Sequence, residues 1–390
     1  MLDPKEAVRA RVEEARDTLL DLSHRIHANP ELGFKEEKAA RWLSEALAKA
    51  GFEVERGACG LPTAFVARAG NGPLHIAICA EYDCLPGIGH ACGHNIIAAA
   101  AIGAGIAAAK VADEVGLTVS VIGTPAEEGG GGKIILLEGG AFNGVHASMM
   151  VHPAPLDVAE PPVIAVSHFD VHYTGKEAHA SSYPEQGINA ADAITVAQTA
   201  IGLLRQHIRP SDRIHGIVTK GGEAPNIVPA HTTAKYYVRA KTLDQLQEIR
   251  AKVDRCFEAG AIATGCTLEI VEVEKPYAEM RHDSEIAALY QRNAEALGRK
   301  FRNTGSAAER FAGSTDMGNI SLAMPAIHPM IGINSWPAAN HQPEFTEHCA
   351  TPVADKAVLD GALALAWTAI DLAADGALRD RLLATSYART

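Results

Sequence analysis

The sequence lacks the features that would place it in several specialised classes of protein. It has no basic excess, because 47 Asp and Glu residues outnumber 35 Lys and Arg residues and leave a formal charge of −12. This balance argues against nucleic acid or an anionic membrane as the main partner. It also has no glycine period, and 47% of its residues are hydrophobic, so it is neither collagen-like nor disordered. Its 390 residues leave room for about two domains with sizeable cores.

Cysteines and long apolar runs are also scarce. The seven Cys residues, an odd number at wide spacings, predict reduced thiols in the cytoplasm rather than a disulfide framework. The first residues enter a charged helical pattern with no apolar segment, so we expect no signal peptide. The apolar stretch at 96–109 is shorter than the roughly 20 residues that span a bilayer. We therefore expect a soluble cytoplasmic protein with no membrane partner.

The order of apolar patterns predicts an α/β fold. Helical spacing of apolar residues occurs at 5–28 and 36–50 and is followed by strand-like runs at 64–69 and 75–80. A helix rich in Ala and Gly at 95–109 and a further strand-like run at 117–123 come next. The run at 75–80 is uniformly apolar, which is typical of a strand buried on both faces. The alternation predicts a central sheet with helices on both sides.

A different pattern begins near residue 165. Strand, helix, strand, strand, helix and strand are predicted in that order at 166–174, 189–206, 214–220, 232–240, 243–261 and 268–273. This β-α-β-β-α-β order is the ferredoxin-like motif. We predict that 166–275 is a complete domain, inserted into a discontinuous larger domain formed by 1–165 and 276–390.

The segment after the strand-like run 75–80 carries a thiol and an imidazole at metal-ligand spacing. It reads Ala80-Glu81-Tyr82-Asp83-Cys84-Leu85-Pro86 and continues through Gly89-His90-Ala91-Cys92-Gly93-His94-Asn95. Ligand sites in open α/β sheets gather beyond the carboxyl ends of strands. Gly93 allows a tight turn, so Cys92 and His94 could face the same ion. A buried Cys beside a surface His is the alternative for this motif taken alone.

Two adjacent carboxylates follow the next strand. Glu127 and Glu128 come after the run 117–123 and precede four glycines at 129–132. One Glu could bind a metal while its neighbour acts as general base on a metal-bound water. A solvated acidic loop is the alternative. A phosphate-binding loop is a weaker alternative, because Lys133 is followed by Ile134 rather than by the Ser or Thr of that motif.

Two histidines lie at comparable places further along the chain. His152 directly follows the strand-like run 147–151, and His341 follows the apolar run 331–333. Each histidine alone is more often structural or merely exposed. Together, however, these ligand types lie where the strands of one sheet would end. They predict a hydrolytic site that holds two metals about 3.5–4 Å apart.

These motifs resemble the M20 family of metallo-amidohydrolases and peptidases, in the branch that carries His-Ala-Cys-Gly-His. The short link from Asp83 to Gly89 resembles the sub-branch of aminobenzoyl-glutamate hydrolases and dipeptidases. The resemblance implies a zinc-peptidase-like catalytic domain, with a central mixed sheet flanked by helices and an inserted lid and dimerisation domain. It implies five metal ligands, which are Cys92, His94, Glu128, His152 and His341. It also implies that Glu127 is the base and that Asp83 orients a ligand.

Glu81 replaces the His of the wider family's His-x-Asp motif, so it could be an extra ligand or an outer-shell group. Asp316 resembles part of a family loop near the site. Asn226 and Arg239 match family positions that hold the substrate carboxylate, for which Arg is well suited. His179 resembles the lid histidine that reaches the partner's site, so each site of a C2 homodimer would take His179 in trans.

The implied reaction is hydrolysis of an amide bond in an N-acyl amino acid, a dipeptide or an aminobenzoyl-glutamate-like substrate that has a free carboxylate. Two divalent ions are implied, either Zn or Mn, with Co or Ni also compatible. Two alternatives stay open at this point. One is a catalytically silent binding protein on the same fold, and the other is a single-metal or structural zinc protein.

Overall fold

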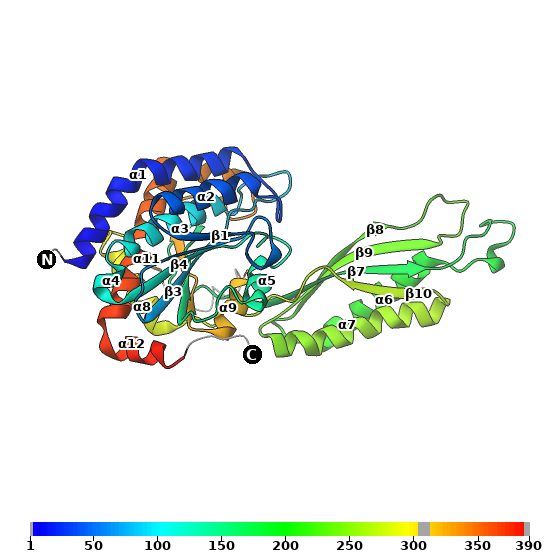
Figure 1. Ribbon diagram of the computed structural model, residues 1–390. Coiled ribbons are helices and arrows are strands. Elements are labelled where there is room, and N and C mark those ends of the chain that lie inside the picture. Colours follow the sequence, from blue (N-terminus) through cyan, green and yellow to red (C-terminus); the bar gives the residue numbers. More distant parts are fainter. Residues whose placement is uncertain (1–2, 303–312, 386–390) are drawn as a thin grey trace. The chain divides into compact units, whose positions relative to one another are not determined.

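The computed structural model describes residues 3–302 and 313–385. The chain forms two compact units (Figure 1). One, the inserted unit, is Val163–Glu279, and the other, the larger unit, combines Met1–Pro162 with Met280–Thr390. The predicted inserted domain, 166–275, lies within the first of these.

The larger unit is built on a six-stranded mixed sheet. Its strand order is β1-β2-β4-β3-β5-β11, in which β2 runs antiparallel to both neighbours and the other pairs are parallel. The strands are β1 Glu53–Arg56, β2 Phe65–Ala69, β3 Leu74–Ala80, β4 Leu117–Gly123, β5 Ala147–Met149 and β11 Ala326–Ile327. Every residue of β3 and β4 is buried, because these strands lie inside the sheet. A central mixed sheet flanked by helices is thus confirmed.

Helix α3 (His94–Ala109) occupies the centre of the helical layer. It packs against α1 (Pro4–Ala28), against α11 (Pro352–Ala374) and against β3 and β4. Its small residues allow this close packing, since a Cβ on Gly103 would lie 2.8 Å from Ala362 Cβ. Helix α11 is long and apolar enough to cross a bilayer, yet 89% of its apolar window is buried inside the unit. Such burial is that of a core helix.

Several shorter elements complete the larger unit. Its further helices are α2 Glu37–Lys49, α4 Ala112–Val115, α5 Gly132–Gly139, α8 Ser284–Glu295, α9 Met317–Ala323, α10 Pro343–His348 and α12 Gly376–Leu383. A separate parallel pair is formed by β6 His152–Ala154 and β12 Met330–Gly332. His152 begins this second small sheet, three residues after β5 of the central sheet ends at Met149.

The inserted unit has the β-α-β-β-α-β order that the sequence predicts. Its elements are β7 Ala165–Thr174, α6 Ala190–Leu204, β8 Arg213–Lys220, β9 His231–Ala240, α7 Leu243–Thr264 and β10 Thr267–Glu272. The strands form an antiparallel sheet in the order β10-β7-β9-β8. Helices α6 and α7 pack on one face of it (Figure 1). Along β7, alternate residues such as Phe169, Val171 and Tyr173 belong to this core.

Candidate metal centre

The loops after β3 and β4 bring four acidic side chains to one edge of the central sheet. The two strands are parallel neighbours that pair in register along their whole length. Glu81 and Asp83 follow β3, and Glu127 and Glu128 follow β4. Because parallel strands end at the same edge, the two loops meet there, which is where ligand sites gather in such sheets.

The start of α3 adds a thiol and an imidazole to this edge. Gly93, the residue that caps the helix, has φ of +74°, a conformation that strains any residue with a Cβ. A Cβ at this position would also lie 2.4 Å from Pro153 Cγ. The glycine between Cys92 and His94 therefore permits both the turn and the close approach of the segment that carries His152.

Five side chains form two ligand groups that share one sulfur. Cys92, His94 and His152 form the first group, and Cys92, Glu128 and His341 form the second, with the ligand atoms of each group within 4.8 Å of one another. Cys92 Sγ lies 3.4 Å from His152 Nε2 and 3.6 Å from His341 Nε2. Glu128 Oε2 lies 3.4 Å from His341 Nε2. The structure thus brings together all five residues that the family resemblance implies as ligands.

Hydrogen bonds orient the imidazoles of His94 and His152 so that Nε2 points into the cluster. His94 Nδ1 lies 3.0 Å from Asp83 Oδ1, and His152 Nδ1 lies 2.9 Å from the carbonyl oxygen of Pro153. A ring nitrogen that donates to such an acceptor leaves the other nitrogen free to bind a metal. Asp83 Oδ2 also accepts from the backbone N–H of Glu128 at 3.0 Å. Asp83 therefore holds both α3 and the loop after β4.

Two buried atoms of the cluster have no hydrogen-bond partner among the described residues. They are His94 Nε2 and Glu128 Oε1. His94 Nε2 instead faces carboxylate oxygens of Glu81, Glu127 and Glu128 at 3.5–3.8 Å. Buried polar atoms are normally satisfied, so an unpartnered one points to a water or an ion. Thiol, imidazole and carboxylate donors around such atoms fit divalent metal ions.

Burial dominates the protonation of these groups. It raises the pKa of Glu127 well above its ordinary value, and the carboxylates of Glu81 and Glu128 raise it further. Burial likewise raises the pKa of the Cys92 thiol, and Glu128 adds to this effect. It lowers the pKa of His152 to about 4. Near neutral pH His152 is therefore in the unprotonated form that binds metals.

A buried lysine that no sequence pattern marks lies next to Glu81. Lys133 Nζ is 2.5 Å from Glu81 Oε1 and 2.6 Å from Asp316 Oδ1, and none of the three side chains is exposed. The backbone N–H of Lys133 also donates to Asp316 Oδ2 at 2.9 Å. Glu81 thus has one carboxylate oxygen in an ion pair and the other 3.5 Å from His94 Nε2. Asp316 joins the site through Lys133.

His328, between β11 and β12, is a second side chain that the sequence does not mark. Its ring packs edge-on against the ring of His152, with the centroids 5.3 Å apart. Within the described part of the chain, neither of its ring nitrogens has a hydrogen-bond partner. Burial holds its pKa well below the ordinary value. A neutral ring therefore packs beside the first ligand group.

In the inserted unit, His179 and Asn226 lie on adjacent backbone segments, whereas Arg239 lies elsewhere. The backbone N–H of Ala180 donates to the carbonyl oxygen of Asn226 at 3.0 Å. Both segments lie beyond the end of the sheet at which β9 begins with His231. Arg239 is eight positions further along β9, roughly 27 Å away at the rise of a strand. The structure therefore does not bring Asn226 and Arg239 of one chain to the same point.

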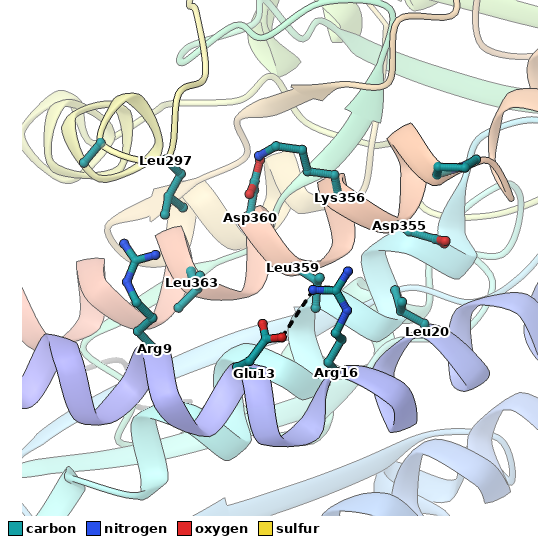
Figure 2. Close-up of a pocket in the computed structure, with 12 residues that line it drawn as sticks. Arg9, Glu13, Arg16, Leu20, Leu297, Asp355, Lys356, Leu359, Asp360 and Leu363 are labelled. Atoms are coloured by element: carbon teal, nitrogen blue, oxygen red, sulfur yellow. Dashed lines mark hydrogen bonds and ion pairs between the residues drawn. The ribbon is translucent and has the colours of Figure 1, made fainter.

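A surface hollow of about 530 Å³ lies away from this cluster (Figure 2). Its lining residues come from α1, from α11 and from the residues just after α8. Charged side chains of this lining pair with one another, for example Glu13 with Arg16 at 3.4 Å and Lys356 with Asp360 at 2.6 Å. Glu13 and Arg16 form an ordinary surface pair, whereas Asp360 is buried and also accepts from Arg299 Nε at 2.7 Å. None of the lining residues belongs to a ligand group, so the candidate metal centre is the cluster at the edge of the central sheet.

The fold carries a candidate metal site at the edge of its central sheet, and comparison with known proteins identifies the family. Residues 77–359 match the model of peptidase family M20/M25/M40. The Xaa-Arg dipeptidase of Mus musculus is 39% identical over 387 residues, which cover 94% of this chain and 88% of that protein. The chain therefore belongs to peptidase family M20/M25/M40.

More distant relatives agree with this assignment. One of the p-aminobenzoyl-glutamate hydrolase subunits of Escherichia coli K12 is 34% identical over 279 residues, covering 66% of this chain and 58% of that protein. The crystal structure of an aminobenzoyl-glutamate utilization protein from Klebsiella pneumoniae superposes with a TM-score of 0.73 at 18% identity, covering 91% and 96% of the two chains. A dinuclear metal-binding M20 peptidase from Bacillus subtilis gives 0.70 at 22% identity, covering 93% and 99%. At such low identity the two structures support the fold alone.

Proposed function

We propose that this hydrolase cleaves the amide bond of a dipeptide or of an aminobenzoyl-glutamate-like N-acyl amino acid with the help of two divalent metal ions. The observation that carries the proposal is the sulfur of Cys92, which belongs to two ligand groups at once. Glu127, which forms a further group with Glu81 and His94, lies 3.8 Å from His94 Nε2. The names of the relatives, a dipeptidase and an aminobenzoyl-glutamate hydrolase, support the substrate class.

The thiol of Cys92 favours Zn or Co, whereas the carboxylate of Glu128 also suits Mn. When bound, such ions lower the pKa of a water molecule and polarise the scissile carbonyl. Glu127 takes the proton of the attacking water and returns it to the nitrogen of the leaving amine. Its buried surroundings suit both steps, because they raise its pKa and so strengthen the carboxylate as a base.

The test of the proposed base is Glu127→Gln, with Glu13→Gln on α1 as a surface control. We expect Glu127→Gln to keep two ions per chain by mass spectrometry while kcat falls by about 10²–10⁴-fold. Dipeptides that end in Arg and p-aminobenzoyl-glutamate, assayed with Zn, Mn and Co, are the substrates to compare. A rate near that of the unmodified enzyme would remove Glu127 from the mechanism.

We further propose that the enzyme is a homodimer in which His179 of one chain donates to the oxyanion in the site of the other. His179 is exposed, and with Asn226 it lies beyond the C-terminal end of β7. The chain enters the inserted unit at the opposite end of that strand, roughly 30 Å away. Asn226 and Arg239 could hold the same substrate carboxylate only if two different chains supplied them.

Mixing two inactive variants tests this arrangement. In a heterodimer of Glu127→Gln with His179→Ala, a trans-acting His179 leaves one site with both defects and the other with none. We expect such heterodimers to recover about half of the activity per dimer. Verified heterodimers that stay inactive would show that His179 acts within its own chain.

A further inference from the structure

The loop that carries Glu127 rests on a segment far away in the sequence, residues 31–36, which we call the support segment. A Cβ on Gly33 would lie 3.0 Å from Ala126 Cβ and 3.2 Å from the carbonyl oxygen of Gly129. A Cβ on Gly130 would lie 2.3 Å from the ring of Phe34. The two segments are therefore in direct contact, and glycines on both sides allow it.

Glu36 ends the support segment and points its carboxylate into this contact. Its side chain is completely buried. It stands at the N-cap position of α2 but makes no side-chain capping bond to that helix. Instead, Glu36 Oε1 accepts a hydrogen bond from the backbone N–H of Ala126 at 2.8 Å. The Glu36 side chain thus accepts a hydrogen bond from the loop after β4 and caps no N–H group of its own helix.

The residue that Glu36 holds has a strained backbone. Ala126 has φ of +58°, in the left-handed region that a residue with a Cβ rarely adopts. Such a conformation persists only where the surroundings impose it, and it often occurs at functional sites. Ala126 directly precedes Glu127, so its backbone angles set the direction in which the Glu127 side chain leaves the chain.

The amide on the other side of Glu127 is held in the same way. Asp83 Oδ2 accepts from the backbone N–H of Glu128 at 3.0 Å. The buried side chains of Glu36 and Asp83 therefore accept hydrogen bonds from the backbone N–H groups of the residues on either side of Glu127, which are Ala126 and Glu128. Asp83 also orients His94, a member of the first ligand group, whereas Glu36 holds the loop through the backbone of Ala126.

We propose that Glu36 is a positioning residue for Glu127, which it aims by holding Ala126 in its left-handed conformation. This inference rests on the proposed role of Glu127 as the base. Glu36 acts through the loop backbone and not on the reacting atoms, so its loss should lower kcat while KM and metal content stay the same. A misplacement of about 1 Å at a catalytic group can cost about 10²-fold in rate.

The test compares Glu36→Ala with Glu36→Gln. The Ala variant removes the acceptor for the Ala126 N–H, and we expect kcat to fall about 10²-fold with KM within about twofold and two ions still bound. The Gln variant keeps an acceptor oxygen at the same place, and we expect it to restore kcat to within about threefold of the unmodified enzyme. If Glu36→Ala fails to fold, Glu36→Asp, which shortens the side chain by one methylene, replaces it with the same expected loss of kcat.

Glu31→Ala is the matched control. The Glu31 carboxylate lies in the same support segment, but it accepts from the backbone N–H groups of Lys38 and Ala39, at 3.0 Å each, at the start of α2. We expect this variant to lower Tm while kcat stays within about twofold. Equal losses of kcat in Glu31→Ala and Glu36→Ala, or equal losses in Glu36→Gln and Glu36→Ala, would overturn the proposal.

Hydrogen exchange of the metal-free protein separates this inference from the proposed function. We expect the peptide that covers 124–131 to exchange faster in Glu36→Ala and unchanged in Glu31→Ala. Unchanged exchange in Glu36→Ala would overturn the positioning role even if Glu127 is the base. An active Glu127→Gln enzyme would instead overturn the proposed function, whatever the exchange result.

Discussion

Replacing Lys133 by Met tests whether the buried ion cluster beside the metal centre stabilises the fold. The substitution keeps most of the aliphatic side chain but removes the ammonium group that lies between Glu81 and Asp316, at 2.5 and 2.6 Å. Both carboxylates would then be buried without this counter-charge. Removing one partner of a buried pair costs about 3–5 kcal/mol. At about 2–4 °C per kcal/mol for a unit of this size, Tm should fall by about 6–20 °C.

The loss of stability in Lys133→Met should depend on pH in a defined direction. Burial raises the pKa of Asp316 to about 6, although Lys133 opposes the shift. Without Lys133 the folded-state pKa rises further above the unfolded value of 3.8. A folded-state pKa above the unfolded one means that stability falls as pH rises between the two values. The deficit of Lys133→Met should therefore be small in acid and grow between about pH 5 and pH 8.

Equilibrium urea unfolding of metal-stripped protein at several pH values measures this deficit, because bound metal would add its own stabilisation. The double variant Lys133→Met with Asp316→Asn is the control, since it removes one of the two unpaired carboxylates. We expect it to be more stable than the single variant at pH 7. A deficit below about 1 kcal/mol, or one that does not change with pH, would refute the argument from unpaired charge.

Three further outcomes follow from the structure. Cys92→Ala should lose both ions by mass spectrometry, because its sulfur belongs to both ligand groups; retention of two ions would contradict the shared role. Gly93→Ala should lower metal affinity by at least about tenfold, since φ of +74° and a Cβ 2.4 Å from Pro153 Cγ force the turn to move; an unchanged dissociation constant in a metal titration would count against this. Burial lowers the pKa of His75 to about 4, so stability should fall by up to about 3 kcal/mol as pH drops from 6.5 to 4. His75→Gln should flatten that part of the stability curve, and equal slopes in both proteins would show that His75 is not the cause.

The pattern of the sequence is enough to predict the long elements and the residue types of the centre. Helices α1 and α3, the strands β3 and β4, and the six elements of the inserted unit all follow from apolar patterns within short windows. The loops after β3 and β4 are recognisable as site loops because each carries ligand-type side chains directly after an apolar strand. The role of each site residue in catalysis stays a prediction that the experiments above address.

The short elements could not be predicted in this way. Helix α5 begins at Gly132, the last of four glycines, and glycine favours a loop in any local assessment. His152 lies in β6, which pairs with β12 from a distant part of the chain, so its place in a separate sheet has no local signature.

The sequence by itself determined which side chains could bind metal, because ligand chemistry resides in residue type and spacing. Only the tertiary structure decided what surrounds them. Lys133 meets Asp316 across 183 residues, and Glu36 meets Ala126 across 90 residues. Neither contact can be recognised from the local sequence pattern. Whether a charge is buried, or whether a carboxylate accepts from a strained amide, depends on which distant segment packs against it. Apolar periodicity shows which face of one segment packs on the core, whereas these contacts depend on how two distant segments pack against each other.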